Sequence, residues 1–343
     1  MATDLPIGLP ELVAFVGLAG LATYAVLAGA DFGAGVWDLL ARGPRAGAQR
    51  NAIAAAIGPV WEANHVWLIF VIVLLFTAFP PAYAALSIAF FVPFHLILAG
   101  IVLRGAGFIF RAHGAEAAAV PSMWGSAFGA ASAMTPFLLG CCLGAVSTGL
   151  IRVVDGRVLS DPLTPWLEPF SLACGALGLA LCAYLAAVYL TLETDGELRG
   201  DFRRRALLCW LVAGAISLGV LGLAHTQAPR LWEALVMPRA APFLLTALVL
   251  AVISGLSLLW GHFLVARVVG AGQVILLLAG WALAQWPYLI YPDLTLHNAA
   301  APSATLWALL VTVPPGLALV LPSLWLLFSV FKGSDSVSDH RTP

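Results

Sequence analysis

Residues 55–80 read AAIGPVWEANHVWLIFVIVLLFTAFP, an apolar run that carries a single carboxylate, Glu62. About 20 apolar residues are enough for a helix to cross the hydrocarbon core of a bilayer. An ionised carboxylate costs several kcal/mol in that environment, so it rarely occurs there without a function or a partner. The run therefore predicts a membrane helix with a polar site near its beginning.

Asn64 and His65 are the polar neighbours expected to complete this site. Glu62 and His65 are three residues apart, so their side chains share one face of a helix. Burial favours the neutral form of a carboxylic acid, and a neutral Glu62 can still exchange a proton with His65 or with a water held by Asn64. We interpret the group as an ion or proton site. The competing interpretation is an acid that only satisfies its own helix end.

Three residues around this group are expected to shape the helix. Pro59 follows a glycine and should kink or begin the helix, which frees backbone groups for hydrogen bonding. Trp61 and Trp67 flank the polar side chains and are assigned to packing.

The composition extends the prediction from one helix to the whole chain. Of the 343 residues, 62% are hydrophobic and 10% are charged, whereas a soluble domain carries about 25% charged residues. A net charge of −1 gives no indication of nucleic-acid binding, and the five cysteines lack the spacing of a metal site or a disulfide framework. We predict an all-α polytopic membrane protein.

The hydrophobic periodicity predicts about nine transmembrane helices in one domain that covers residues 1–343, with a polar tail at 332–343. The predicted spans are 9–40, 51–79, 82–110, 122–150, 165–191, 205–226, 240–267, 271–291 and 303–331. Twelve Lys and Arg residues, Arg104 among them, fall on the side opposite the N-terminus, and four fall on the N-terminal side. Since cytoplasmic loops are rich in Lys and Arg, we expect the N-terminus outside and the C-terminus in the cytoplasm.

The first predicted helix carries a second membrane-embedded acid, Asp31, in the stretch GADFGAG. Asp31 either forms a hydrogen bond into the second helix or belongs to a polar path. Gly29, Gly33 and Gly35 surround it, and small residues at this spacing let another helix approach closely. We therefore assign these glycines to helix packing.

Two alternative functions are compatible with parts of this pattern. His65 and His95 fall deep in adjacent predicted helices, so they could meet and bind a haem as axial ligands, although two hydrogen-bonded core histidines or a proton relay are favoured. A secondary transporter would also suit sparse buried acids. It should show inverted repeats and broken helices in both halves, and the sequence shows neither.

Several motifs occur in order along the chain and resemble those of one known family. They are GADFGAG from Gly29, GPVWEANHVWL from Gly58, LFTAFPPAYAAL from Leu75, LRGAGFIFR from Leu103 and WPYLIYP from Trp286. Together they resemble subunit II of the cytochrome bd-type quinol oxidases. By position, Asp31 takes the place of the aspartate in the family's glycine motif, and Glu62 that of the aspartate after its tryptophan.

The resemblance implies two four-helix bundles plus one peripheral helix, in a bacterial plasma membrane. It also implies a haem-bearing partner, subunit I, with haems b and d or haem b only, which holds the quinol site and the oxygen chemistry. The chain itself is expected to bind no haem or metal, to support subunit I and to line a proton path from the cytoplasm. Membrane lipid, a structural quinone and a small single-helix accessory subunit are further expected associates.

The sequence departs from the family pattern at informative positions. Glu62 replaces the usual aspartate, which keeps the charge and lengthens the side chain by one methylene. Ala28 stands where some relatives carry a further acid, and neither His65 nor His95 belongs to the pattern. These departures suggest a divergent branch whose polar path is shortened or rerouted.

Overall fold

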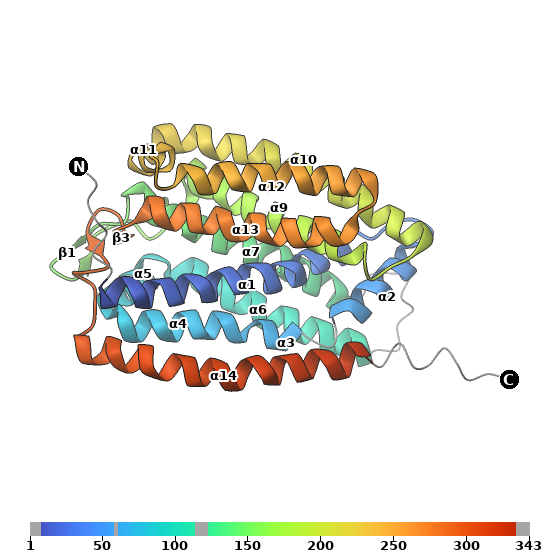
Figure 1. Cartoon of the computed structure of the whole chain (residues 1–343), viewed down its shortest axis with the longest axis horizontal. Helices are drawn as coiled ribbons and strands as arrows, with labels where there is room; N and C mark the ends of the chain where they lie inside the picture. The colour runs from blue at the N-terminus through green and yellow to red at the C-terminus, as the bar shows by residue number, and fades with distance from the viewer. Residues whose placement is uncertain (1–7, 58–60, 114–122, 334–343) are drawn as a thin grey trace.

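Long apolar helices lie side by side along the molecule, as the hydrophobic runs predict (Figure 1). The computed structural model describes residues 8–57, 61–113 and 123–333, without the side chains of residues 61, 62, 111–113, 328 and 331–333. Within these ranges, eight helices are long and apolar enough to cross a membrane, and one bent helix pair would make a ninth. The prediction of an all-α polytopic membrane protein is confirmed.

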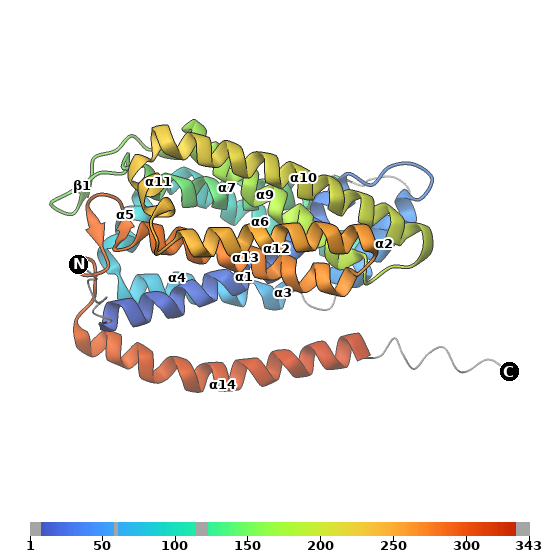
Figure 2. The same ribbon diagram turned by 45° about the horizontal axis from the view of Figure 1, so that its top comes forward.

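The long helices form two groups of four, with one further helix at the edge. The first group consists of α1 (Leu9–Leu39), α4 (Val66–Ala78), α6 (Phe91–His113) and α7 (Met123–Thr148). The second consists of α9 (Pro169–Leu190), α10 (Gly196–Gln227), α12 (Ala241–Trp260) and α13 (Phe263–Gln285). Helices α1 and α7 both pack on α9 and thereby join the two groups. Helix α14 (Ser303–Gly333) runs along the outside, beside α1 and α4 (Figure 2).

Short elements occupy the ends of the bundle. The short helices are α2 (Ala46–Ile57), α3 (Trp61–Asn64), α5 (Pro80–Ala89), α8 (Thr164–Leu167) and α11 (Pro229–Val236). Strands β1 (Val153–Val154) and β2 (Arg157–Val158) pair antiparallel, as do β3 (Tyr288–Ile290) and β4 (Leu294–Thr295). The predicted polar tail begins inside α14, and its residues from 334 onward lie outside the described part of the chain.

The second and third predicted spans differ from the structure. The second is divided into α2, α3 and α4, and the third begins only at Phe91, since residues 80–89 form the separate helix α5. Helices α4 and α5 meet at an angle of 119°. Pro80 and Pro81 explain this break, because proline has no N–H to continue the hydrogen bonds of the preceding helix.

Three other boundaries were predicted wrongly. Helix α10 begins at Gly196, so the charged segment before Ala206 is helical and not a loop. The turn between α12 and α13 lies at Gly261, whose left-handed φ of 81° suits a glycine helix end. The stretch WPYLIYP is not the end of a helix, since α13 ends at Gln285 and Tyr288 begins strand β3.

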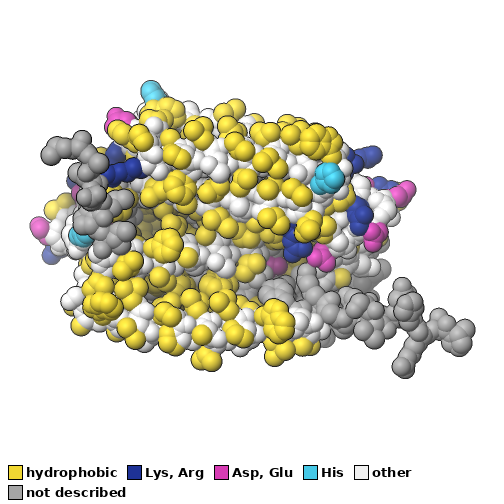
Figure 3. All heavy atoms as spheres, viewed as in Figure 1, with side chains coloured by type: hydrophobic (Ala, Val, Ile, Leu, Met, Phe, Trp, Pro, Cys, Tyr) yellow, Lys and Arg dark blue, Asp and Glu magenta, His cyan; other side chains and the backbone are white. Residues whose placement is uncertain are grey.

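The surface has the distribution of polarity that a membrane protein requires. In the face shown in Figure 3, hydrophobic side chains cover the middle of the molecule, and most charged side chains gather towards its two ends. Leu218 on α10, Leu248 on α12 and Leu319 on α14 are among the large hydrophobic residues that are exposed along the helices. Such a continuous apolar surface is stable in lipid and would aggregate in water.

Candidate functional site

Asp31 is buried in the middle of the first helix group, with 5% of its surface exposed. It lies on α1, in the glycine-rich part of that helix. Its Oδ2 atom accepts a hydrogen bond of 2.8 Å from Nδ2 of Asn64, the last residue of α3, which is also buried. Of the two sequence interpretations of Asp31, the hydrogen bond into the predicted second helix is therefore present in the structure.

Arg104 is the cation that faces this carboxylate. It lies on α6 with only 1% of its surface exposed, and its Nη2 atom is 3.7 Å from Oδ2 of Asp31. Its guanidinium carbon is 5.1 Å from the ring centre of Phe32 and 5.4 Å from that of Phe128. Buried charges are costly unless they are paired, and stacking on aromatic rings adds to the stabilisation of a guanidinium. The sequence predicts Arg104 among the cations at the side opposite the N-terminus, whereas the structure buries it in the interior beside Asp31.

His65 lies beside Arg104, at the turn between α3 and α4. The distance between Nε2 of His65 and Nη1 of Arg104 is 3.4 Å. The imidazole ring also faces Tyr24 and Phe32, with ring centres 6.1 and 5.9 Å apart. The expectation of one continuous helix through Glu62 and His65 is wrong, because the helix is interrupted at His65 itself.

Polar atoms with unmet hydrogen-bonding capacity surround this group. Within the described part of the chain, the Tyr24 hydroxyl, Nδ1 of His65 and Nε1 of Trp67 are buried and make no hydrogen bond. Buried polar groups in native proteins are almost always paired with protein or water. The surroundings of Asp31 are therefore polar enough to hold bound water or protons.

The structure describes the remaining residues of the predicted site only in part. The backbone of Glu62 is in α3, two residues before Asn64, but the side chains of Trp61 and Glu62 are not described, and Pro59 lies outside the described ranges. Only Asp31, Asn64 and His65 of the four predicted proton-path residues can therefore be placed, and the structure brings these three together around Arg104.

The glycines next to Asp31 permit close helix packing. A Cβ atom on Gly33 would overlap the carbonyl group of Cys182 on α9, and one on Gly35 would overlap the side chain of Ser132 on α7. At Gly29, a Cβ atom would make an ordinary contact of 3.4 Å with Leu185. Gly33 and Gly35 thus set the distance from α1 to its neighbours, whereas Gly29 is not required sterically.

His65 and His95, the two histidines considered as haem ligands, have different surroundings. His95 is exposed on α6, and its Nδ1 atom is 2.7 Å from the carbonyl oxygen of Phe91. His65 turns its Nε2 atom towards the Arg104 guanidinium, a cation that disfavours a metal ion on the same nitrogen. His95 also precedes Arg104 by nine residues on α6, about 13.5 Å of helix at 1.5 Å per residue. His65 and His95 therefore do not fit a pair of axial haem ligands.

The comparisons with known proteins identify the family. Residues 9–331 match the family described as cytochrome bd terminal oxidase subunit II. The chain belongs to this family. A subunit II relative in Bacillus subtilis, named as a putative cytochrome bd menaquinol oxidase subunit, is 21% identical over 90% of this chain and 91% of its own length. Subunit 2 of the Escherichia coli cytochrome bd-I ubiquinol oxidase is 29% identical over 56% of this chain and 52% of its own length.

A solved structure extends the family assignment to three dimensions. A chain of the bd oxidase from Geobacillus thermodenitrificans superimposes with a TM-score of 0.79 at 25% sequence identity, covering 95% of this chain and 99% of that one. The bd oxidase subunit II motif GADFGAG is the segment that places Asp31 at the packed crossing of α1 with α7 and α9. The resemblance inferred from the sequence motifs is confirmed.

In this bd oxidase subunit II chain, the sequence did not lead us to predict Arg104 as a member of the cluster around Asp31. A signal for it was present: an arginine within an apolar run, in a chain that also buries an aspartate on another helix. Ionisable residues inside membranes usually pair with one another, so a search for the partner of Asp31 would have found it.

Proposed function

We propose that this chain is the haem-free subunit of a membrane quinol oxidase, in which a second, haem-bearing subunit oxidises quinol and reduces oxygen to water. Family membership over residues 9–331 supports the assignment to such a complex. The contacts of His65 and His95 do not favour a pair of axial ligands, and this supports placing the haems in the partner. In this arrangement the chain stabilises the partner subunit.

We further propose that the cluster around Asp31 belongs to a proton path from the cytoplasm. The observation that carries this proposal is the 2.8 Å hydrogen bond from Asn64 to Asp31, because it joins the helix of Asp31 to the short helix that contains Glu62. Oxygen reduction consumes protons, and taking them from the cytoplasm makes the reaction electrogenic. Titratable side chains and bound water must carry these protons through the hydrocarbon.

In this proposal, Arg104 stabilises the negative charge of Asp31 on the proton path. Its positive charge stabilises an ionised Asp31, and the hydrogen bond from Asn64 fixes the orientation of the carboxylate. Glu62, close by in the chain, is the group we propose to exchange protons. His65 contacts Arg104 through Nε2, so its Nδ1 atom, which makes no hydrogen bond, is the atom that we propose to take part in the next transfer.

The orientation of the chain is part of the same proposal. With the N-terminus outside and the C-terminus in the cytoplasm, the short helix α3, which contains Glu62, precedes the membrane helix α4 on its cytoplasmic side. A cytoplasmic reporter fused after Pro343 should then be active. Activity of a periplasmic reporter only, at the same position, would contradict the orientation and the direction of proton entry.

Glu62→Gln tests the proton path, because glutamine keeps the size and hydrogen bonding of the side chain but cannot titrate. We expect an assembled complex with its haems, and oxygen uptake per haem lowered several-fold or more. Glu62→Asp should have a mild effect, since it keeps a titratable carboxylate and shortens the side chain by one methylene. Glu233→Gln, which removes an exposed carboxylate from α11, is the matched control. Unchanged oxygen uptake per haem in Glu62→Gln would exclude Glu62 from the path.

A further inference from the structure

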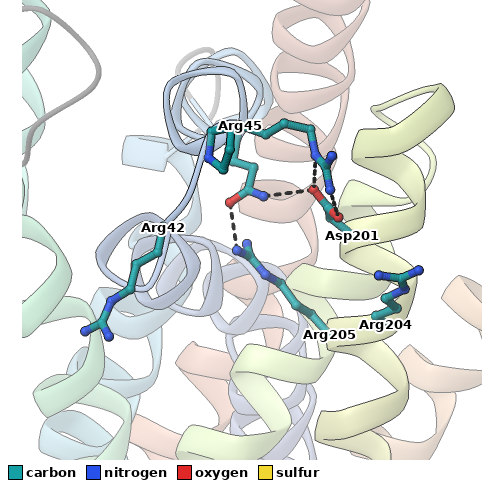
Figure 4. A pocket seen from close by; sticks show the side chains of 7 residues that line it. Arg42, Arg45, Asp201, Arg204 and Arg205 are labelled. Atoms are coloured by element: carbon teal, nitrogen blue, oxygen red, sulfur yellow. Dashed lines mark hydrogen bonds and ion pairs between the residues drawn. The ribbon is translucent and has the colours of Figure 1, made fainter.

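A shallow recess rich in arginine lies at one end of the bundle, where the segment after α1 meets the beginning of α10. It has a volume of about 310 Å³ and is lined by Arg42, Pro44, Arg45, Gln49, Asp201, Arg204 and Arg205 (Figure 4). Four guanidinium groups and one carboxylate give this lining an excess of three positive charges. None of these residues belongs to the cluster around Asp31.

The only acid of the lining is already neutralised by one of the arginines. Nε and Nη2 of Arg45 donate to the two carboxylate oxygens of Asp201 at 2.8 and 2.7 Å, and Arg45 also binds Glu197 at 3.0 Å. A third hydrogen bond of 3.0 Å reaches Asp201 from Nε2 of Gln49. Arg45 and Asp201 therefore form a fixed pair, and no other carboxylate of the lining balances the charges of Arg42 and Arg204.

Arg205 is held in place beside this pair. Its Nη2 atom donates to Oε1 of Gln49 at 2.7 Å, and its guanidinium carbon is 5.0 Å from the ring centre of Trp37. Arg42 and Arg204 are both exposed, and Figure 4 shows them on opposite sides of Arg205. Within the described part of the chain, neither makes a hydrogen bond or an ion pair. The recess thus combines a rigid floor with free cationic groups at its rim.

The position of the recess points to the headgroup region of the membrane. Arg42 follows the end of the membrane helix α1, and Arg204 and Arg205 directly precede the apolar part of α10. Basic pockets between membrane helices at this depth suit anionic lipid headgroups, and guanidinium groups match phosphate oxygens in geometry and charge. We propose that the recess binds the phosphate group of an anionic phospholipid.

The test compares lipids of different charge on the purified complex. Delipidated complex is returned to nanodiscs of phosphatidylcholine alone or with phosphatidylglycerol, and its Tm and retained phosphatidylglycerol are measured. We expect phosphatidylglycerol to raise the Tm of the wild type and to be retained through detergent exchange. The variant R42Q/R204Q should lose most of both effects, and each single variant should lose part of them. Arg157→Gln, which removes an exposed arginine from strand β2, should behave as the wild type.

The remaining outcomes overturn the proposal. Equal retention and equal Tm shifts in the wild type and R42Q/R204Q would show that the recess binds no anionic lipid. A Tm in phosphatidylcholine alone that equals the Tm with phosphatidylglycerol would show that stabilisation does not require an anionic headgroup. The same stabilisation by millimolar inorganic phosphate in a phosphatidylcholine nanodisc would identify a free anion and not a lipid as the ligand.

Discussion

Arg104 on α6 and Asp31 on α1 form an ion pair in the interior of the first helix group, with Nη2 of Arg104 3.7 Å from Oδ2 of Asp31. Both side chains are almost completely buried. The pair closes a network that continues to Asn64 on one side and to His65 on the other. Burying an isolated charge at this depth would cost free energy, and the opposite charge of the partner offsets part of that cost for each residue.

Arg104→Gln should strongly reduce the yield of assembled complex. Removing one partner of a buried ion pair typically costs about 3–5 kcal/mol, because the remaining charge is left without compensation. The double variant D31N/R104Q has no buried charge and should recover much of the yield. The haem content per membrane protein and the Tm of the purified complexes measure this coupling. Strictly additive effects of the two substitutions would show that the pair contributes no interaction energy.

Gly33→Ala should separate α1 from α9. The added methyl group would overlap the backbone carbonyl of Cys182, and a backbone cannot move aside as a flexible side chain can. Overpacking of this kind costs about 1–3 kcal/mol, so we expect a lower Tm and less complex. Gly219→Ala on α10 is the control, because no atom lies within 4 Å of the added group. A Tm as high in Gly33→Ala as in Gly219→Ala would contradict the close packing.

The Arg152–Asp293 pair outside the spanning helices gives a pH-dependent contribution to stability. Asp293 accepts hydrogen bonds from Nε of Arg152 at 2.9 Å and from the Val153 N–H at 2.7 Å. The hydrogen bond from Arg152 is the main reason that the pKa of Asp293 lies below its usual range, and the Val153 N–H lowers it further. A lowered pKa stabilises the folded protein above the pKa of the unfolded chain, and this contribution is lost as the pH falls through the folded value.

Asp293→Asn should therefore cause a small decrease in Tm at pH 7. The difference from the wild type should shrink as the pH falls below about 3.9, the usual pKa of aspartate. Thermal unfolding of the purified complex over this pH range is the measurement. Asp155→Asn, in the turn between β1 and β2, is the control in the same loop region. A Tm difference that does not change with pH would exclude the ionised carboxylate as its cause.

Predictions that depend on consecutive apolar residues were accurate, and predictions that depend on local backbone geometry were not. The bounds of α1 were predicted almost correctly, because a helix that crosses a membrane requires a long run of consecutive apolar residues. The interruption at His65 and the separate helix α5 were missed, since local backbone geometry decides them within a run that stays apolar throughout. Sequence hydropathy does not report such breaks.

The site shows the same division. Asp31 and Asn64 were singled out because polar residues are conspicuous within apolar helices. Arg104 was counted among the cations on the cytoplasmic side, since it lies towards the end of a predicted span, and only the tertiary structure brings it to Asp31. A meeting of His95 with His65 was the less favoured alternative, and the side of α6 on which His95 lies is exposed. Which face of a membrane helix is buried cannot be derived from hydropathy when every face is apolar.

His95→Ala tests whether any haem iron is bound by this chain. The imidazole of His95 is exposed, its Nδ1 atom lies 2.7 Å from the Phe91 carbonyl oxygen, and its ring packs at 4.2 Å on the ring of Phe91. Since these contacts account for the side chain without a metal, we expect the optical haem spectrum of the complex to stay unchanged. His225→Ala, on α10, controls for the loss of a histidine elsewhere. Loss of one haem band from a complex that still assembles, in His95→Ala only, would show that the chain supplies an axial ligand.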